Sequence, residues 1–168
     1  MQTPIPLTRD LVLIGGGHTH ALVLRQWGMK PLPGVRLTVI NPGPTAPYSG
    51  MLPGLIAGHY TLDDNHIDLA KLCRFAGARF IHAEVTGFDI EQQRVQLSGR
   101  PALSFDYASI NTGAAPDQSV PGVAEFATPI KPIAQFTQRW QHLLDEFKAS
   151  KGKKHIAVVG SGAGGIEV

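Results

Sequence analysis

Two short apolar runs in this chain each lead directly into a cluster of glycines, and this pattern limits the folds that the chain can adopt. Residues 11–14 lead into glycines at 15–17, and residues 155–159 lead into the glycine-rich segment 160–165. A continuous run of β-branched and other apolar residues is typical of a parallel strand that is buried on both faces. A strand that ends in a glycine turn before a helical pattern predicts a βαβ unit, so we expect an α/β protein.

The residues after the first glycine cluster support this unit. Apolar residues recur at helical spacing over 21–27, Gly28 is a helix stop signal, and a second strand is expected over 35–40. A short helix is expected over 68–75 with Gly77 at its end, and an amphipathic helix of about 16 to 18 residues is expected from Ile133.

Further strands are expected along the middle of the chain. They cover residues 79–82, 85–90, 94–97, 103–105 and 107–110. The three at 85–90, 94–97 and 103–105 predict a small antiparallel meander. Residues 41–60 are rich in proline and glycine but also carry apolar side chains, so we expect this segment to pack over another part of the protein.

Composition excludes several classes of protein. Hydrophobic residues make up 43% and charged residues 17% of the 168, as in an ordinary globular protein, and a formal charge of +2 without a basic block does not predict nucleic-acid binding. A single cysteine, Cys73, excludes a redox cysteine pair within these residues and makes the cytoplasm the expected compartment. No apolar run reaches the roughly 18 to 20 residues of a membrane span, so we expect no integral membrane segment.

The second glycine cluster matches the dinucleotide-binding fingerprint in full. In Gly160-x-Gly162-x-x-Gly165, the first glycine allows the tight turn, the second allows the backbone to approach a pyrophosphate, and the third allows helix and strand to pack closely. The alternative is a tight strand-to-helix turn without a ligand.

The first cluster matches the fingerprint at two of its three positions. Gly15 and Gly17 fit, but His20 replaces the third glycine, so either the helix stands off the strand or the imidazole turns outward. Asn41 ends the second strand where an acidic residue would contact a ribose, and it is either a ribose ligand or a plain turn residue before proline.

Other chemically active residues have simpler interpretations. His18 and His20 are two apart and lack companion ligands, so we expect no metal site, although His18 could donate to a phosphate near a helix N-terminus. Cys73 is expected to be a small core residue. No pattern of nucleophile and base is present, and we assign no catalytic residue.

The order of these motifs resembles the pyridine nucleotide-disulfide oxidoreductase superfamily. The strand and glycines of 11–17, the Asn111-Thr112-Gly113 turn after a strand, and the segment 157–167 match the FAD loop, the Ala-Thr-Gly motif and the NAD(P)H loop of that family. The chain looks closest to type II NADH dehydrogenases and sulfide:quinone reductases. More narrowly, residues 15–20 and 46–54 are similar to the NADH dehydrogenase-like module fused to selenophosphate synthetase (selenide, water dikinase).

The resemblance implies a Rossmann-like FAD-binding fold, the start of a second Rossmann domain, and hydride transfer from NAD(P)H to FAD and on to a small-molecule acceptor. It implies an FAD-binding domain over 1–120, a connector with an amphipathic helix over 121–153, and the first strand and loop of an NAD(P) domain over 154–168. Expected FAD contacts are Gly15, Gly16, Gly17, His18, Asn41, Pro42, Ser49, Met51, Val85, Thr112 and Gly113. Expected NAD(P)H contacts are Gly160, Gly162 and Gly165.

The resemblance also implies a fused C-terminal selenophosphate synthetase domain and a homodimer as partners. We expect the isolated 168 residues to bind FAD weakly or not at all, because the family closes its flavin site with a C-terminal segment. Two alternatives remain open: a nucleotide-binding regulatory module without turnover, and a nucleotide-free scaffold attached to a larger protein.

Overall fold

The computed structural model describes residues 6–168, and the chain divides into two compact units, which are described separately. The first unit contains the residues up to Tyr48 together with His66–Thr112. The second unit contains Ser49–Asn65 together with Gly113–Val168.

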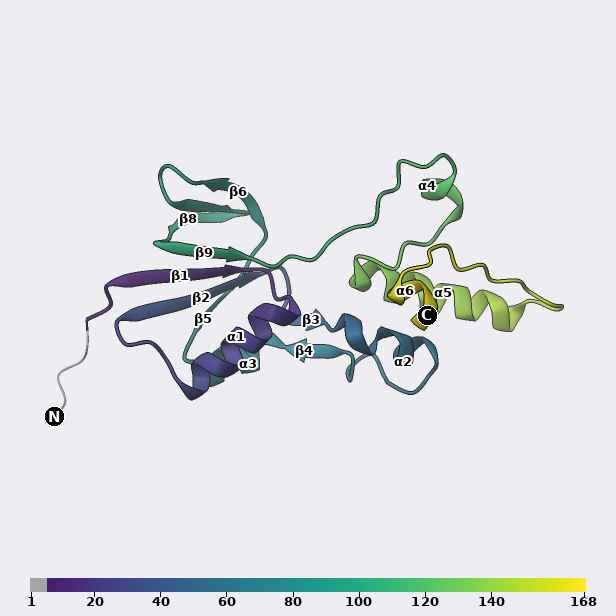
Figure 1. Cartoon of the computed structure of the whole chain (residues 1–168), viewed down its shortest axis with the longest axis horizontal. Helices are drawn as coiled ribbons and strands as arrows, with labels where there is room; N and C mark the ends of the chain where they lie inside the picture. Colours follow the sequence, from purple (N-terminus) through teal and green to yellow (C-terminus); the bar gives the residue numbers. More distant parts are fainter. Residues whose placement is uncertain (1–5) are drawn as a thin grey trace. The chain divides into compact units, whose positions relative to one another are not determined.

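A four-stranded parallel sheet forms the centre of the first unit (Figure 1). Its strands are β1 (Arg9–Ile14), β2 (Val35–Asn41), β5 (Arg79–His82) and β9 (Tyr107–Ile110), in the order β5-β2-β1-β9. All three pairings are parallel, which confirms the predicted α/β class with a strand–helix–strand unit at its start. The carboxyl ends of these strands therefore meet at one edge of the sheet.

Two helices cover one face of this sheet. They are α1 (His18–Met29) and α3 (Leu69–Ala76), and their buried side chains form one core with those of β1 and β2, namely Leu13, Leu24, Leu37, Val39, Leu69, Cys73 and Ala76. The prediction that α1 stops at Gly28 is wrong, because the helix continues to Met29. A Cβ at Gly28 would lie 2.5 Å from Cδ1 of Phe75 in α3, so this glycine allows the two helices to approach closely.

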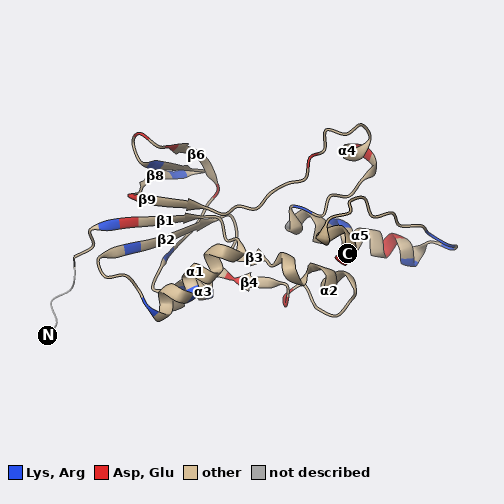
Figure 2. Cartoon of the chain, in the orientation of Figure 1, with Lys and Arg blue, Asp and Glu red and all other residues tan. Residues whose placement is uncertain are grey.

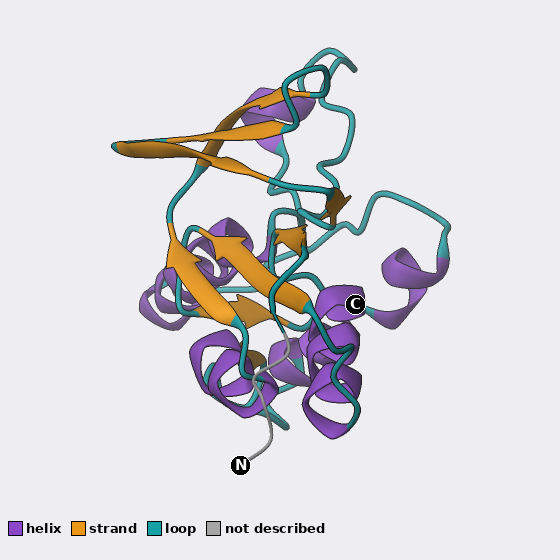
Figure 3. Cartoon of the chain, turned by 90° about the vertical axis from the view of Figure 1, so that its left-hand side faces the viewer, coloured by secondary structure: helices purple, strands orange, loops and turns teal. Residues whose placement is uncertain are grey.

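The predicted antiparallel meander covers the opposite face. It consists of β6 (Val85–Asp89), β7 (Arg94–Leu97) and β8 (Arg100–Ser104), which pair in that order. Figure 3 shows it as a layer of strands separate from the parallel sheet. Its buried side chains pack against those of β1 and β2 in a second core of Val12, Ile14, Ile40, Val95 and Leu97. The third strand begins at Arg100, three residues before its predicted start.

A short antiparallel pair that the sequence did not predict completes the first unit. β3 (Thr45–Pro47) pairs with β4 (His66–Asp68), and each strand has only three residues. Asp68 then caps α3, because its side chain accepts a hydrogen bond from the backbone N–H of Lys71 at 2.8 Å. Gly77 ends α3 in the left-handed conformation, as predicted for a C-terminal glycine.

The second unit is helical in its described residues. It contains the 3-10 helix η1 (Ser49–Met51), α2 (Leu52–Ile56), α4 (Val123–Phe126), α5 (Ile133–Ala149) and α6 (Ala163–Glu167). Leu52 and Leu55 of α2 share a core with Ile133 and Phe136 of α5. This contact confirms that the proline- and glycine-rich segment packs, and the 17-residue α5 confirms the predicted amphipathic helix.

The strand predicted over 155–159 does not form. These residues pair with no strand, and Val159 is 91% exposed. A parallel strand needs a neighbouring strand for its backbone hydrogen bonds, and none of the described strands lies beside this segment. Among the helices of residues 6–168, none has both the length and the apolar character that a membrane span requires.

Candidate functional site

The loop between β1 and α1 lies at the carboxyl edge of the parallel sheet and leaves no room for side chains on its first glycine. Gly15 has φ of +88°, a conformation that favours glycine, and its N–H donates to the carbonyl of Ile40 at 2.8 Å. A Cβ at Gly15 would lie 2.9 Å from Cα of Thr112, in the turn after β9. The loop therefore runs directly against that turn.

Gly16 and Gly17 also lack room for a side chain, and the atoms that crowd them come from different segments. A Cβ at Gly16 would overlap Cδ1 of Leu69 and lie 3.1 Å from Cβ of Ala46. A Cβ at Gly17 would overlap the side chain of Asn111 and lie 2.7 Å from its Nδ2. Gly17 was predicted to allow close approach of a pyrophosphate, but the fold requires glycine there without any ligand. The pyrophosphate contact stays a prediction.

Asn41, the last residue of β2, holds this loop from the side. Its Oδ1 accepts the N–H of Gly16 at 2.8 Å, and its Nδ2 donates to the carbonyl of Gly43 at 2.8 Å. The side chain is 9% exposed, and it does more than a plain turn residue would do, because it joins β2 to the glycine loop. A ribose contact from Asn41 stays a prediction.

The helix that follows presents its amino-terminal end at this edge. Gly17 is the N-cap of the 12-residue α1, no side chain caps it, and its first turn contains no acidic residue. Unpaired N–H groups and the helix dipole make such an end favourable for an anion. His18 begins the helix, is exposed, and stacks on Tyr48 with ring centroids 4.7 Å apart.

His20 lies inside the fold, so the second of the two alternatives stated above, an imidazole that turns outward, is wrong. The residue is 1% exposed. Its Nδ1 lies 2.7 Å from the carbonyl oxygen of Gly15, and its Nε2 lies 2.9 Å from Oγ of Ser109 in β9. His20 precedes the buried Leu24 by one helical turn, and this i, i+4 spacing is the sequence signal that it lies on the buried face.

Charged side chains are absent from the sequence around this edge and gather at the opposite end of the sheet. Residues 14–20, 39–48 and 107–113 contain no Asp, Glu, Lys or Arg, and Figure 2 shows the charges of β1 and β2 at their amino-terminal ends. There, the Asp10 carboxylate pairs with Arg36 and raises the pKa of that guanidinium. The Asp10 backbone N–H donates to Asp106 and lowers the pKa of that carboxyl. The polar groups of the glycine edge are therefore backbone groups, imidazoles and uncharged amide side chains such as those of Asn41 and Asn111.

The predicted FAD residues divide between the two units. The first unit brings a set of them to the ends of neighbouring parallel strands: Gly15, Gly16, Gly17, His18, Asn41, Pro42 and Thr112. Val85, the first residue of β6, belongs to the same unit and is half-buried. The remaining predicted FAD residues lie in the second unit and are Ser49, Met51 and Gly113.

The second glycine cluster has the tight turn that its fingerprint predicts, although the strand before it does not form. Gly160 has φ of +128°, and a Cβ at Gly165 would lie 2.9 Å from the carbonyl carbon of Gly160. Gly162 is the N-cap of α6, and its carbonyl accepts the N–H of Gly165 at 3.0 Å. The first and third glycines are therefore required by the turn itself, and the NAD(P)H contacts stay predictions.

Cys73 is confirmed as a core residue. It is 1% exposed in α3, and burial raises its pKa to about 11. A thiol of this kind is protonated at neutral pH and is a poor nucleophile.

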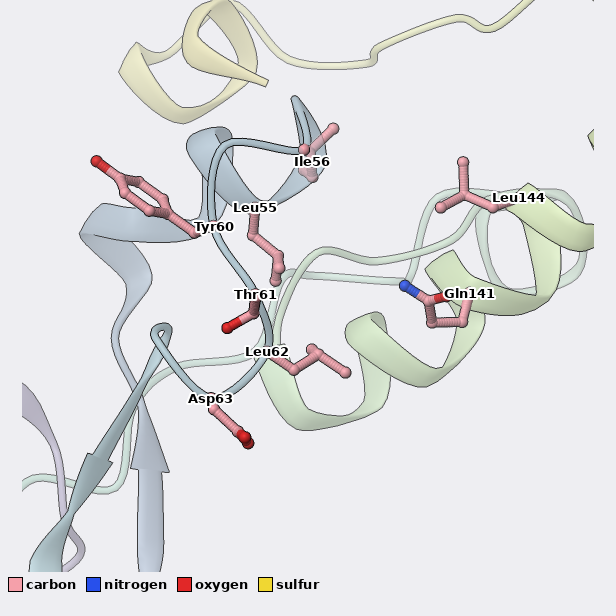
Figure 4. Close-up of a pocket in the computed structure, with 9 residues that line it drawn as sticks. Leu55, Ile56, Tyr60, Thr61, Leu62, Asp63, Gln141 and Leu144 are labelled. Atoms are coloured by element: carbon pink, nitrogen blue, oxygen red, sulfur yellow. The ribbon is translucent and has the colours of Figure 1, made fainter.

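A cavity of about 490 Å³ lies within the second unit, apart from any predicted contact. It is lined by Leu55 and Ile56 of α2, by the 58–63 loop, and by Gln141 and Leu144 of α5. In Figure 4, Tyr60 points away from α5. The lining combines apolar and polar side chains, and it includes none of the residues that the sequence predicts to contact FAD or NAD(P)H.

One family model matches nearly all of the described chain. The family model described as pyridine nucleotide-disulphide oxidoreductase matches residues 9–168. Among curated proteins, demethylphylloquinone reductase NdbB from Synechocystis sp. is 31% identical over 103 residues, which are 58% of this chain and 26% of that protein.

Solved structures show the same fold. The sulfide:quinone oxidoreductase of Aquifex aeolicus superposes with a TM-score of 0.68 at 22% identity, covering 84% of this chain and 33% of that one. NDH2 of Plasmodium falciparum, in complex with NADH, gives 0.67 at 18% identity, covering 84% and 30%. A ferredoxin reductase of Rhodopseudomonas palustris gives 0.69 at 21% identity, covering 95% and 39%. The chain thus spans between about a quarter and two fifths of these proteins.

Proposed function

The chain belongs to the pyridine nucleotide-disulphide oxidoreductase family, and we propose that it is the N-terminal part of an FAD-dependent NAD(P)H oxidoreductase. Proteins of this family bind FAD together with NADH or NADPH. The proposed reaction passes a hydride from NAD(P)H to the flavin, which then reduces a separate acceptor.

The glycine loop at the carboxyl edge of the parallel sheet carries this proposal. The loop is shaped by contacts on both sides, lies against the turn after β9, and leads into an uncapped helix end without acidic residues. These features suit the pyrophosphate of a dinucleotide, because the backbone can approach the anion and the helix end favours it.

The residues of the first unit would bind and orient the dinucleotide. Gly15 to Gly17 would place the pyrophosphate near the start of α1, and an N–H of the exposed His18 imidazole would donate a hydrogen bond to a phosphate oxygen. When bound, FAD supplies the hydride-accepting chemistry. We propose no acid–base or nucleophilic residue, and Cys73 is unsuited to either role because its thiol is buried and its pKa is raised.

We also make a proposal about the electron acceptor and the metabolic role of the protein. Similarity to the module fused to selenophosphate synthetase supports a role in selenium metabolism and a synthetase domain as a fused partner. Two relatives carry demethylphylloquinone or quinone in their names, which supports a quinone as acceptor. The rates at which a soluble quinone and selenium compounds re-oxidise the reduced protein would distinguish between these acceptors. We also propose that the protein is a homodimer in the cytoplasm.

The test is the spectrum of the full-length protein that carries this sequence. We expect it to purify yellow and to bleach without oxygen when NADH or NADPH is added. Gly17→Leu should abolish the colour, because its side chain would collide with Asn111, whereas Gly43→Ala should keep it, since the nearest atom to that Cβ is 3.8 Å away. A colourless protein that takes up no FAD would contradict the proposal.

The regulatory-module alternative makes a different prediction. It expects nucleotide binding in calorimetry with no reduction of a flavin. The scaffold alternative expects FAD, NADH and ADP to leave the melting temperature unchanged, because a ligand that binds only the native state must raise it.

A further inference from the structure

The buried imidazole of His20 connects two segments of the first unit that lie far apart in the sequence. One ring nitrogen lies at hydrogen-bond distance from the Gly15 carbonyl in the glycine loop, and the other from the hydroxyl of Ser109 in β9. The Asn111 turn that follows β9 is also tied to the loop, since its carbonyl accepts the N–H of Gly17 at 3.2 Å. His20 therefore joins the two segments that border the candidate dinucleotide edge.

The partners determine which nitrogen carries the proton. The carbonyl of Gly15 can only accept, so Nδ1 must be the donor at 2.7 Å. The hydroxyl of Ser109 can donate, so Nε2 can accept from it with a lone pair at 2.9 Å. Both partners are neutral, and a neutral ring with its proton on Nδ1 satisfies every polar atom of the side chain.

The position of His20 in the glycine motif makes this arrangement specific. A glycine at position 20 would leave the Gly15 carbonyl without this donor, and the loop would keep only its backbone contacts and the hydrogen bond from the Gly16 N–H to Asn41. Leaving a buried carbonyl unpaired is costly, so the imidazole holds the loop in one conformation.

We propose that His20 is a positioning residue that clamps the glycine loop to β9, and thereby holds the loop in the shape that binds the dinucleotide. The binding half of this statement rests on the proposed function. The clamp itself concerns only the conformation of the loop and can be measured without a ligand.

The first test is the tautomer of His20 in the protein labelled with ¹⁵N-histidine. We expect the nuclear magnetic resonance spectrum to show a proton on Nδ1. Ser109→Ala should shift the Nε2 resonance, because it removes the donor hydroxyl, whereas Ser104→Ala on the exposed face of β8 should not. A proton on Nε2 alone would overturn the proposal.

The second test is the exchange of the Gly17 amide. We expect His20→Leu to raise its hydrogen-exchange rate about tenfold relative to the amides of β1, because the loop loses a buried hydrogen bond. His20→Asn should restore part of the protection, since its amide nitrogen can donate to the Gly15 carbonyl from near the position of Nδ1 but has no group that reaches Ser109. Leu24→Ala, one turn further along the same buried face, should speed exchange throughout the core without this bias toward the loop. The clamp would be overturned if Leu24→Ala raised the exchange rate of the Gly17 amide, relative to the amides of β1, as much as His20→Leu does.

The third test is titration of the full-length apoprotein with FAD. We expect His20→Leu to weaken FAD binding about tenfold, and His20→Asn to recover part of it, because asparagine can keep the Gly15 bond but not the Ser109 bond. If the wild type binds no FAD but the exchange result holds, the proposed function fails and the clamp stands. If FAD binds equally well to His20→Leu, the positioning role fails and the proposed function stands. If His20→Leu does not fold, two other results test the clamp: the tautomer of His20 and the exchange of the Gly17 amide in Ser109→Ala. An unchanged exchange rate of the Gly17 amide in Ser109→Ala would contradict the clamp.

Discussion

Gly16 occupies a crowded position of the glycine loop in the first unit. It is not one of the fingerprint glycines, yet its missing side chain makes room for Leu69 of α3 and Ala46 of β3. Its N–H is also held by Asn41. The packing of this residue explains why three glycines occur in a row where the motif needs only two.

We expect Gly16→Ala to destabilise the protein by about 1–3 kcal/mol, because a new methyl group would displace Leu69 in a packed core. Urea unfolding would measure the loss. Gly43→Ala is the matched control, with no atom closer than 3.8 Å to its Cβ, and should stay within about 0.5 kcal/mol of the wild type. Equal losses for the two variants would contradict this account of the loop.

Cys73 gives the protein a stability term at alkaline pH. Burial raises the thiol pKa from 9.0 to about 11, so the folded state holds its proton where the unfolded state releases it. This contribution is complete below pH 9 and is lost as pH rises through 11, by about 2–3 kcal/mol in total. Urea unfolding at several pH values should therefore show that the free energy of unfolding falls less between pH 9 and 11 in Cys73→Ala than in the wild type. Parallel profiles would mean that the thiol titrates normally.

At the scale of elements, α3 is defined by signals at both of its ends. Asp68 caps its first turn through the Lys71 N–H, and Gly77 ends it with a φ of +62°. The helix has eight residues, too few to persist without such caps and its packing against α1. The sequence predicted the helix over 68–75 with Gly77 at its end, and the observed helix is shifted by one residue at each end because Asp68 is its N-cap.

We expect Asp68→Ala to cost about 1 kcal/mol of stability, because the Lys71 N–H loses its acceptor. Asp68→Ser should retain most of the stability, since its hydroxyl can accept the same bond. Thermal unfolding of the two variants would measure the difference. A serine variant as unstable as the alanine variant would show that the cap is not the cause.

At the scale of the whole molecule, each compact unit joins stretches that are distant in the sequence. The second unit combines Ser49–Asn65 with Gly113–Val168. Leu55 from the first stretch and Phe136 from the second belong to one hydrophobic core. The first unit closes its sheet by adding β9 beside β1. Residues 113–119, which follow β9, contain neither helix nor strand and are exposed.

We expect limited proteolysis to begin in this exposed stretch and in the exposed segment 155–159. Thermolysin should cut before Val120, which is 58% exposed, and before Val159, which is 91% exposed, and should spare Val95, which is fully buried in β7. Mass spectrometry of the early fragments would locate the cuts. First cuts within the meander would contradict the expectation.

Hydrophobic pattern and glycine placement were enough to predict the parallel strands, the meander and α5 of this protein. Those elements depend on local runs of side chains and on turns whose geometry few residues can adopt. The three-residue strands β3 and β4 carry no such signal, because each forms only through pairing with the other. The segment 155–159 has a strand pattern but no neighbouring strand among those described, so it does not form one.

The roles of His20 and Asn41 depended on the tertiary structure. The sequence by itself established that a glycine loop follows a buried strand and that its third motif position is occupied by histidine. It did not determine where the imidazole points, because Ser109 lies 89 residues away and meets it only once β9 pairs with β1. Local patterns specify backbone shape, whereas the partners of a buried polar side chain come from whichever segments the sheet brings beside it.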